Sequence, residues 1–148
     1  MAIIIGANFG YCVLAAVGIA VQCTLTGAAV GSARKRFNVQ YPDNGGGRYS
    51  DKLSDEDWVK FNNIKRVNDN YTEQVGIVLS MLLLSGLFMP RAAASFGASY
   101  IVGRFIYGKG YTASGPKGRL YGAPLMMLSL VSMAGIAAYN AAMTTIFA

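Results

Sequence analysis

Long stretches with few charged side chains alternate along this chain with short charged segments. Residues 1–33 and 120–148 contain no charged side chain, and residues 75–90 follow a charged segment without one ionisable group. About 20 apolar residues in helical form cross the hydrocarbon core of a bilayer. The pattern predicts a single all-α membrane domain over residues 1–148, a four-helix bundle with helices at about 5–35, 55–89, 91–112 and 119–147 and a polar loop at 37–54.

Local signals support the boundaries of the second predicted helix. Ser54 is followed by the acidic residues 55–57, which is typical of an N-cap with negative charge in the first helical turn. Pro90 cannot continue the helix, because it has no N–H to donate and its ring blocks the preceding turn. The run Gly45–Gly47 lacks the lysine and the strand of a phosphate-binding loop, so we interpret it as part of the polar connection.

Composition and charge agree with an integral membrane protein. The 148 residues are 53% hydrophobic and only 14% charged, and their mean hydropathy is positive, whereas about 25% charged residues is usual in soluble domains. The net charge of +6 does not indicate nucleic acid, because the basic residues flank apolar runs, as topology signals do. Of the 13 basic residues, eight lie between Arg34 and Arg66 and three more lie near the third connection. The first and third connections should therefore share one side of the membrane, with both termini opposite. With no His and two Cys, we expect no metal site.

Polar side chains recur at helical spacing where the second and third helices enter the membrane. One stripe, with intervals of four, four and three, contains Asn62, Arg66, Asn70 and Glu73; the other, with intervals of four, three and four, contains Tyr100, Arg104, Tyr107 and Tyr111. Such spacing places each set on one helix face. Charges at membrane depth cost roughly 2.5–3.5 kcal/mol each, so they face a protein interior or a wet cavity. We therefore interpret the two stripes as facing surfaces of a binding site.

The residue types in the stripes indicate the chemistry of a ligand. Guanidinium groups pair with carboxylates, Glu73 can pair with an ammonium, and the amides and phenols add neutral hydrogen bonds. A peptide with two carboxylates and one amine, such as glutathione, would satisfy the whole set. An alternative is that Arg66, Glu73 and Arg104 only neutralise one another inside the bundle.

Several motifs resemble those of one known family. They are Phe61-Asn-Asn-Ile-Lys-Arg66 with Asn70 and Glu73, Ala33-Arg-Lys-Arg36, Val39-Gln-Tyr-Pro42, Pro90-Arg91, and Ile101-Val-Gly-Arg104-Phe-Ile-Tyr107-Gly-Lys-Gly-Tyr111. Over nearly the whole chain they resemble the membrane-associated proteins in eicosanoid and glutathione metabolism (MAPEG). The resemblance implies a left-handed four-helix bundle that forms a homotrimer, with glutathione held between neighbouring subunits near one membrane face.

The resemblance also implies roles for individual residues. Arg119 would stabilise the glutathione thiolate, which makes it the predicted catalytic residue. The glutathione-binding residues would be Arg34, contributed by the neighbouring subunit, and Arg66, Asn68, Asn70, Glu73, Gln74, Arg104, Tyr107 and Tyr111. Gln74 stands where some relatives have a tyrosine. The interval from Tyr111 to Arg119 is one residue longer than in some relatives, which makes Lys117 the alternative to Arg119.

The expected function is that of a membrane-bound glutathione transferase or peroxidase acting on lipophilic electrophiles or lipid hydroperoxides. The alternative is a non-catalytic structural or lipid-binding subunit of a larger membrane complex. We expect the partners to be two further copies of the chain, membrane lipids and a lipophilic second substrate, with no nucleic acid. The expected location is the endoplasmic reticulum, with a mitochondrial membrane as the alternative.

Overall fold

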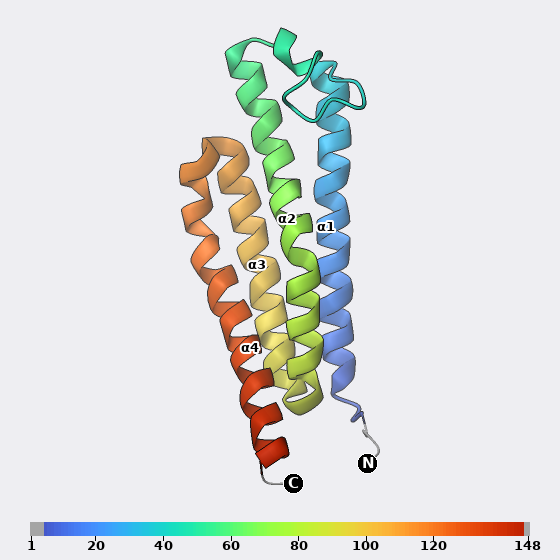
Figure 1. The fold of residues 1–148 in the computed structure, drawn as a ribbon, viewed down its shortest axis with the longest axis vertical. Coiled ribbons are helices and arrows are strands. Elements are labelled where there is room, and N and C mark those ends of the chain that lie inside the picture. Colours follow the sequence, from blue (N-terminus) through green and yellow to red (C-terminus); the bar gives the residue numbers. More distant parts are fainter. Residues whose placement is uncertain (1–4, 147–148) are drawn as a thin grey trace.

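The computed structural model describes residues 5–146, which form four long helices lying side by side (Figure 1). The helices are α1 (Phe9–Phe37), α2 (Asp55–Phe88), α3 (Pro90–Ser114) and α4 (Ala123–Ile146), with short 3-10 helices η1 (Ser50–Lys52) and η2 (Gly115–Tyr121). The first turn of α1 and the last turn of α4 lie at one end of the bundle. At the other end, α1 and α2 extend beyond the turn between α3 and α4 (Figure 1). The all-α four-helix fold is as predicted.

The helix boundaries follow local chemistry. The Ser54 hydroxyl accepts a hydrogen bond from the Asp57 N–H at 3.2 Å, so α2 begins with the expected cap. Helix α1 ends at Phe37, two residues beyond the predicted end. The next residue, Asn38, takes the left-handed conformation (φ 54°), and its N–H bonds to the Arg34 carbonyl. The other end of α1 differs too, because the helix begins at Phe9 and not near residue 5; Gly6 and Asn8 are poor helix formers.

The predicted start of the fourth helix at residue 119 is wrong. The chain first forms η2, and α4 begins only at Ala123. Pro124 occupies the first turn of α4, where a missing N–H costs nothing. Gly122 lies so close to α3 that an added Cβ would be 2.3 Å from the Gly103 carbonyl oxygen, and this contact fixes where the turn ends. Residue 147, the predicted last residue of the helix, lies outside the described residues.

Helices α2 and α3 form the centre of the bundle, with α1 and α4 packed against them from either side (Figure 1). Fully buried Ile19, Tyr71, Leu82, Tyr100 and Met133 bring all four helices into one core. A second apolar cluster joins the connecting loop to the long ends of α1 and α2. Its members are Ala33, Phe37, Val39 and Phe61, with the Phe37 and Phe61 rings packed edge to face at 6.1 Å.

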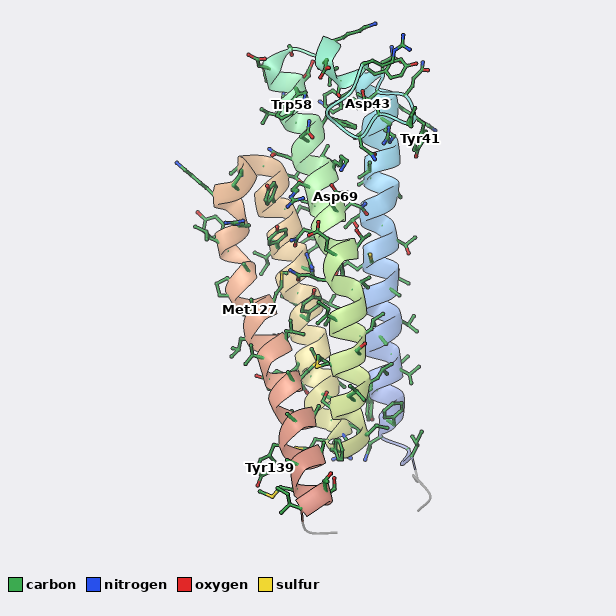
Figure 2. All side chains as sticks on the ribbon, in the orientation of Figure 1. Tyr41, Asp43, Trp58, Asp69, Met127 and Tyr139 are labelled. Carbon is green, nitrogen blue, oxygen red and sulfur yellow. The ribbon has the colours of Figure 1, made fainter. Side chains whose placement is uncertain are left out.

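The outer surface of the bundle is apolar. Large exposed side chains include Leu14 and Leu25 on α1 and Met127 on α4; Figure 2 shows Met127 and Tyr139 on the outer side of α4. Of the helices in the described part, α1, α2 and α4 are long and apolar enough to span a membrane. Helix α3 is less apolar, but it returns the chain between α2 and α4, which run in the same direction (Figure 1). That α3 also crosses the membrane stays a prediction from the sequence.

The loop between α1 and α2 is organised around Asp43, seen at the long end of the bundle in Figure 2. The buried carboxylate accepts hydrogen bonds from the backbone N–H groups of Gly45, Tyr49 and Ser50, each at 2.8 Å, and from the Ser50 hydroxyl at 2.9 Å. Removal from water opposes ionisation, but these donors outweigh it and hold the pKa of Asp43 well below its usual range. The Asn62 amide secures the loop to α2 by donating to the Gly45 carbonyl at 3.1 Å.

We expect the loop to open in acid and in the variant Asp43→Asn. Because the pKa of Asp43 is lowered by folding, its contribution to stability is full above about pH 4, the ordinary aspartate range, and is lost as pH falls through the lowered value. In the variant, an NH₂ group would face several N–H donors. Limited proteolysis within residues 38–54 should be faster for Asp43→Asn than for Asp51→Asn, an exposed aspartate of the same loop. Equal cleavage rates would contradict this role.

Candidate functional site

Arg104 lies inside the bundle, with only 4% of its surface exposed. Its Nη1 donates to Asn70 Oδ1 at 2.9 Å, and its Nη2 donates to Gln74 Oε1 at 2.8 Å and to the Asn70 carbonyl at 3.1 Å. Its Nε donates to the Tyr100 hydroxyl at 3.0 Å. The stripes on α2 and α3 therefore do face each other, as the spacing predicted.

No carboxylate of residues 5–146 forms an ion pair with Arg104. Its charge is met instead by neutral oxygens and by aromatic rings, with the Tyr71 ring centroid at 4.3 Å and the Tyr107 centroid at 5.6 Å. Tyr71 is fixed in turn by donating to Gln22 Oε1 on α1 at 2.8 Å. A buried cation that keeps its charge raises the potential around it and favours anions nearby.

In front of Arg104 lies a groove of about 380 Å³ between α2, α3 and α4, which we call the α2–α4 groove. Its lining residues are Asn70, Gln74, Tyr100, Tyr107, Arg119, Leu120, Ala123, Met126, Met127 and Leu130. The wall from α2 and α3 is polar, whereas the wall from α4 is apolar. Arg104 does not line this groove but lies behind Asn70 and Gln74.

Arg66 and Glu73 lie on the same face of α2 as Asn70 but are half exposed. Arg66 Nη1 is 3.7 Å from Glu73 Oε1, and each side chain is 56% exposed. Neither side chain lines the α2–α4 groove. On α3, the rings of Tyr107 and Tyr111 are buried and packed 5.7 Å apart. Asn62, the first residue of the α2 stripe, bonds to the Gly45 loop instead.

Close backbone contacts place Arg119 beside the groove. An added Cβ on Gly118 would lie 1.9 Å from the Gly110 carbonyl oxygen, so η2 and the end of α3 meet backbone to backbone. Only glycine permits this approach. The turn begins at Gly115 with φ 63°, also a glycine conformation. Arg119 lines the α2–α4 groove, whereas the exposed Lys117 does not.

Arg34 and Asn68 are not brought into the α2–α4 groove of the same protomer. Buried Arg34 donates to Asn44 Oδ1 at 2.9 Å and stacks on Tyr41, while its Nε has no hydrogen-bond partner among the described residues. It lines a separate groove of about 750 Å³ at the end of α1. Asn68 points to α1 and accepts a hydrogen bond from the Thr26 hydroxyl at 3.0 Å.

Sequence reasoning missed the partners that surround Arg104 and the apolar wall of the groove. Gln22 gave no signal because it lies among apolar residues, and Tyr71 falls outside the polar stripe of α2. Each meets Arg104 or its neighbours only after folding. Met126 and Leu130 on α4 could not be distinguished from lipid-facing residues. Tyr100 was recognised as part of the α3 stripe but not as a residue of the site.

These features define a class of protein: a multi-pass integral membrane bundle with an electropositive groove that opens beside an apolar helix. The family model described as the MAPEG family matches residues 12–139, and the chain belongs to this family. Members of the family include membrane glutathione transferases and peroxidases and leukotriene-related proteins; they typically use glutathione and usually form trimers.

Proposed function

We propose that this protein is a membrane-bound glutathione transferase or peroxidase of the kind found among microsomal glutathione transferases of the third type. The observation that carries the proposal is the α2–α4 groove. It combines Arg119, the amides of Asn70 and Gln74 and the Tyr107 phenol on one side with an apolar α4 wall on the other. A polar peptide thiol and a lipophilic partner would meet between these walls.

Each polar group then has a task in binding glutathione. Arg66 holds a carboxylate, Glu73 holds the amino group, and Asn70, Gln74, Tyr107 and Tyr111 bind the peptide. Arg119 lines the same groove and stabilises the sulfur as a thiolate. This matters because an ordinary thiol, with a pKa of about 8.5, is mostly protonated at neutral pH.

The thiolate performs the chemistry. In transfer, its sulfur attacks an electrophilic carbon of the second substrate and forms a C–S bond. Either a leaving group departs with its bonding electrons, or a carbon–carbon π bond breaks and the resulting carbanion takes up a proton. In peroxide reduction, the sulfur attacks the distal oxygen of the hydroperoxide, the O–O bond breaks, and the alkoxide takes up a proton to give the alcohol. A second glutathione reduces the resulting sulfenic acid to water and glutathione disulfide. The second substrate enters from the lipid along Met127 and Leu130 of α4.

The proposal includes a homotrimer. Arg66 and Glu73 are half exposed on one face of the protomer, whereas Arg34 lines the groove at the end of α1. Two different surfaces of one chain that complete one site imply a heterologous contact, which forms a ring when the rotation between copies closes. Three copies would place the α1 surface of each protomer against the α2 surface of the next and cover the exposed charges. Residence in the endoplasmic reticulum remains part of the proposal, with a mitochondrial membrane as the alternative.

Glutathione titration of the purified protein in mild detergent, with the oligomeric mass measured on the same sample, tests this proposal. We expect saturable binding to a trimer and ultraviolet absorbance from a bound thiolate at neutral pH. A monomer that bound glutathione equally well would contradict the shared site.

The second candidate function is a non-catalytic subunit of a membrane complex. The observation that favours it is the Arg66–Glu73 pair, in which the two charges already neutralise each other at 3.7 Å. Absence of the thiolate signal in a correctly assembled protein would support the non-catalytic function and contradict the proposal that the protein is an enzyme.

A further inference from the structure

Asn70 and Gln74 present only one half of their amide groups to the α2–α4 groove. The oxygen of Asn70 accepts from Arg104 at 2.9 Å, and the oxygen of Gln74 accepts from Arg104 at 2.8 Å. The Tyr100 hydroxyl also lies 3.4 Å from the Gln74 oxygen. Both acceptors therefore point away from the groove, into the bundle.

The NH₂ groups of the same two side chains have the opposite environment. Neither NH₂ group donates a hydrogen bond to any group of residues 5–146. Neither nitrogen is fully buried, so both are open to the groove that their side chains line. An Asn or Gln amide can usually turn over to suit its partner. Here it cannot, because turning either amide would aim an N–H donor at the Arg104 guanidinium, which has only donors.

We propose that Arg104 acts as a positioning residue that locks Asn70 and Gln74 as a donor-only pair, so that this wall of the groove selects an anionic acceptor of the ligand. The inference rests on the proposed function, and the acceptor would be a carboxylate or the thiolate of glutathione. Arg104 itself need not touch the ligand. It supplies the fixed orientation of the amides and an unneutralised positive charge behind them.

The geometry of Arg104 explains why a guanidinium is needed. Its two Nη atoms donate to Asn70 and Gln74, which lie one turn apart on α2, while its Nε donates to Tyr100 on α3. A lysine would keep the charge but could not hold both oxygens in one plane. Gln74 is the residue that sets specificity in this arrangement, because a carboxylate at this position would neutralise Arg104 and offer the groove an acceptor.

The test is ligand binding by wild type, Gln74→Glu and Arg104→Lys, measured with glutathione, S-methylglutathione and glutathione diethyl ester. For Gln74→Glu we expect at least about a tenfold loss of glutathione affinity, the size expected when a charge-assisted contact is replaced by repulsion. The loss should be smaller for whichever analogue lacks the recognised anion: the diester for a carboxylate, the methylated thiol for the thiolate. Thermal stability should be retained, because Arg104 gains a carboxylate partner.

Two further variants distinguish the effect of the fixed amide orientation from the effect of the Arg104 charge alone. Arg104→Lys should also lose glutathione affinity although it keeps the positive charge, because the amides are then free to turn. Asn140→Asp adds the same negative charge to α4, about 20 Å along the helix from Met126, and should bind all three ligands as wild type does.

The outcomes distinguish this inference from the proposed function. If wild type does not bind glutathione, the proposed function fails and the inference falls with it. If wild type binds but Gln74→Glu weakens all three ligands equally, the acceptor is not anionic and the inference alone is overturned. Wild-type affinity for glutathione in Arg104→Lys would also overturn the inference. If Gln74→Glu fails to fold, the Arg104→Lys measurement alone tests the inference.

Discussion

Arg119→Ala is expected to lower the turnover number by about 10²–10³-fold, the cost of removing one donor from a site that stabilises developing negative charge. The physical reason is that the guanidinium interacts most strongly with charge on sulfur. The affinity for glutathione should change little, since the neutral thiol gains less from Arg119 than the thiolate does. The rate should recover at higher pH, because without the guanidinium the thiol returns toward its ordinary pKa of about 8.5. Turnover and thiolate absorbance followed against pH measure both effects.

Lys117→Ala is the matched control for this prediction. Lys117 is two residues away on η2 and exposed, but it does not line the α2–α4 groove. Its removal should leave both turnover and the thiolate signal near wild type. If Lys117→Ala abolished the thiolate while Arg119→Ala did not, the basic residue would have been assigned two positions too far along the chain.

Much of the fold could be predicted because charges and prolines mark the ends of apolar segments. Ser54 capped α2 as expected and the helix ended before Pro90, since both signals act within a few residues of themselves. The start of α4 could not be predicted in this way. The turn before it depends on Gly110 and Gly118 meeting backbone to backbone, and a contact between two helices leaves no periodic trace in the sequence.

The candidate site was predictable to a similar degree. Helical spacing correctly placed Asn70 and Arg104 on facing surfaces, because periodicity identifies a helix face. It could not show that Arg104 is held by neutral oxygens of α2 and lies behind the groove. It also could not show that Arg34 and Asn68 turn toward other surfaces of the protomer. Such partnerships depend on side-chain direction and on subunit contacts, which spacing does not encode.

Arg66→Ala should affect binding more than chemistry. Arg66 is expected to hold a glutathione carboxylate equally in the ground state and the transition state, so its loss should raise the KM for glutathione with little change in turnover number. A hydrogen bond to a charged group contributes about 1.5–3 kcal/mol, which corresponds to roughly a 10- to 150-fold rise in KM. Steady-state kinetics, with glutathione varied at a saturating concentration of the second substrate, measure the effect. The control is Lys60→Ala, because Lys60 is an exposed residue of the same helix that pairs with Glu56.

A double variant of Arg66 and Glu73 distinguishes ligand binding by the two residues from mutual neutralisation of their charges. If Arg66 only neutralises Glu73 across their 3.7 Å contact, then removing both charges in Arg66→Ala/Glu73→Gln should restore the wild-type KM. If each residue grips its own end of glutathione, the double variant should bind more weakly than either single variant, because the carboxylate and the amino group of the ligand both lose a partner. We expect the second result, since both side chains are half exposed and a pair this open gains little from its own attraction.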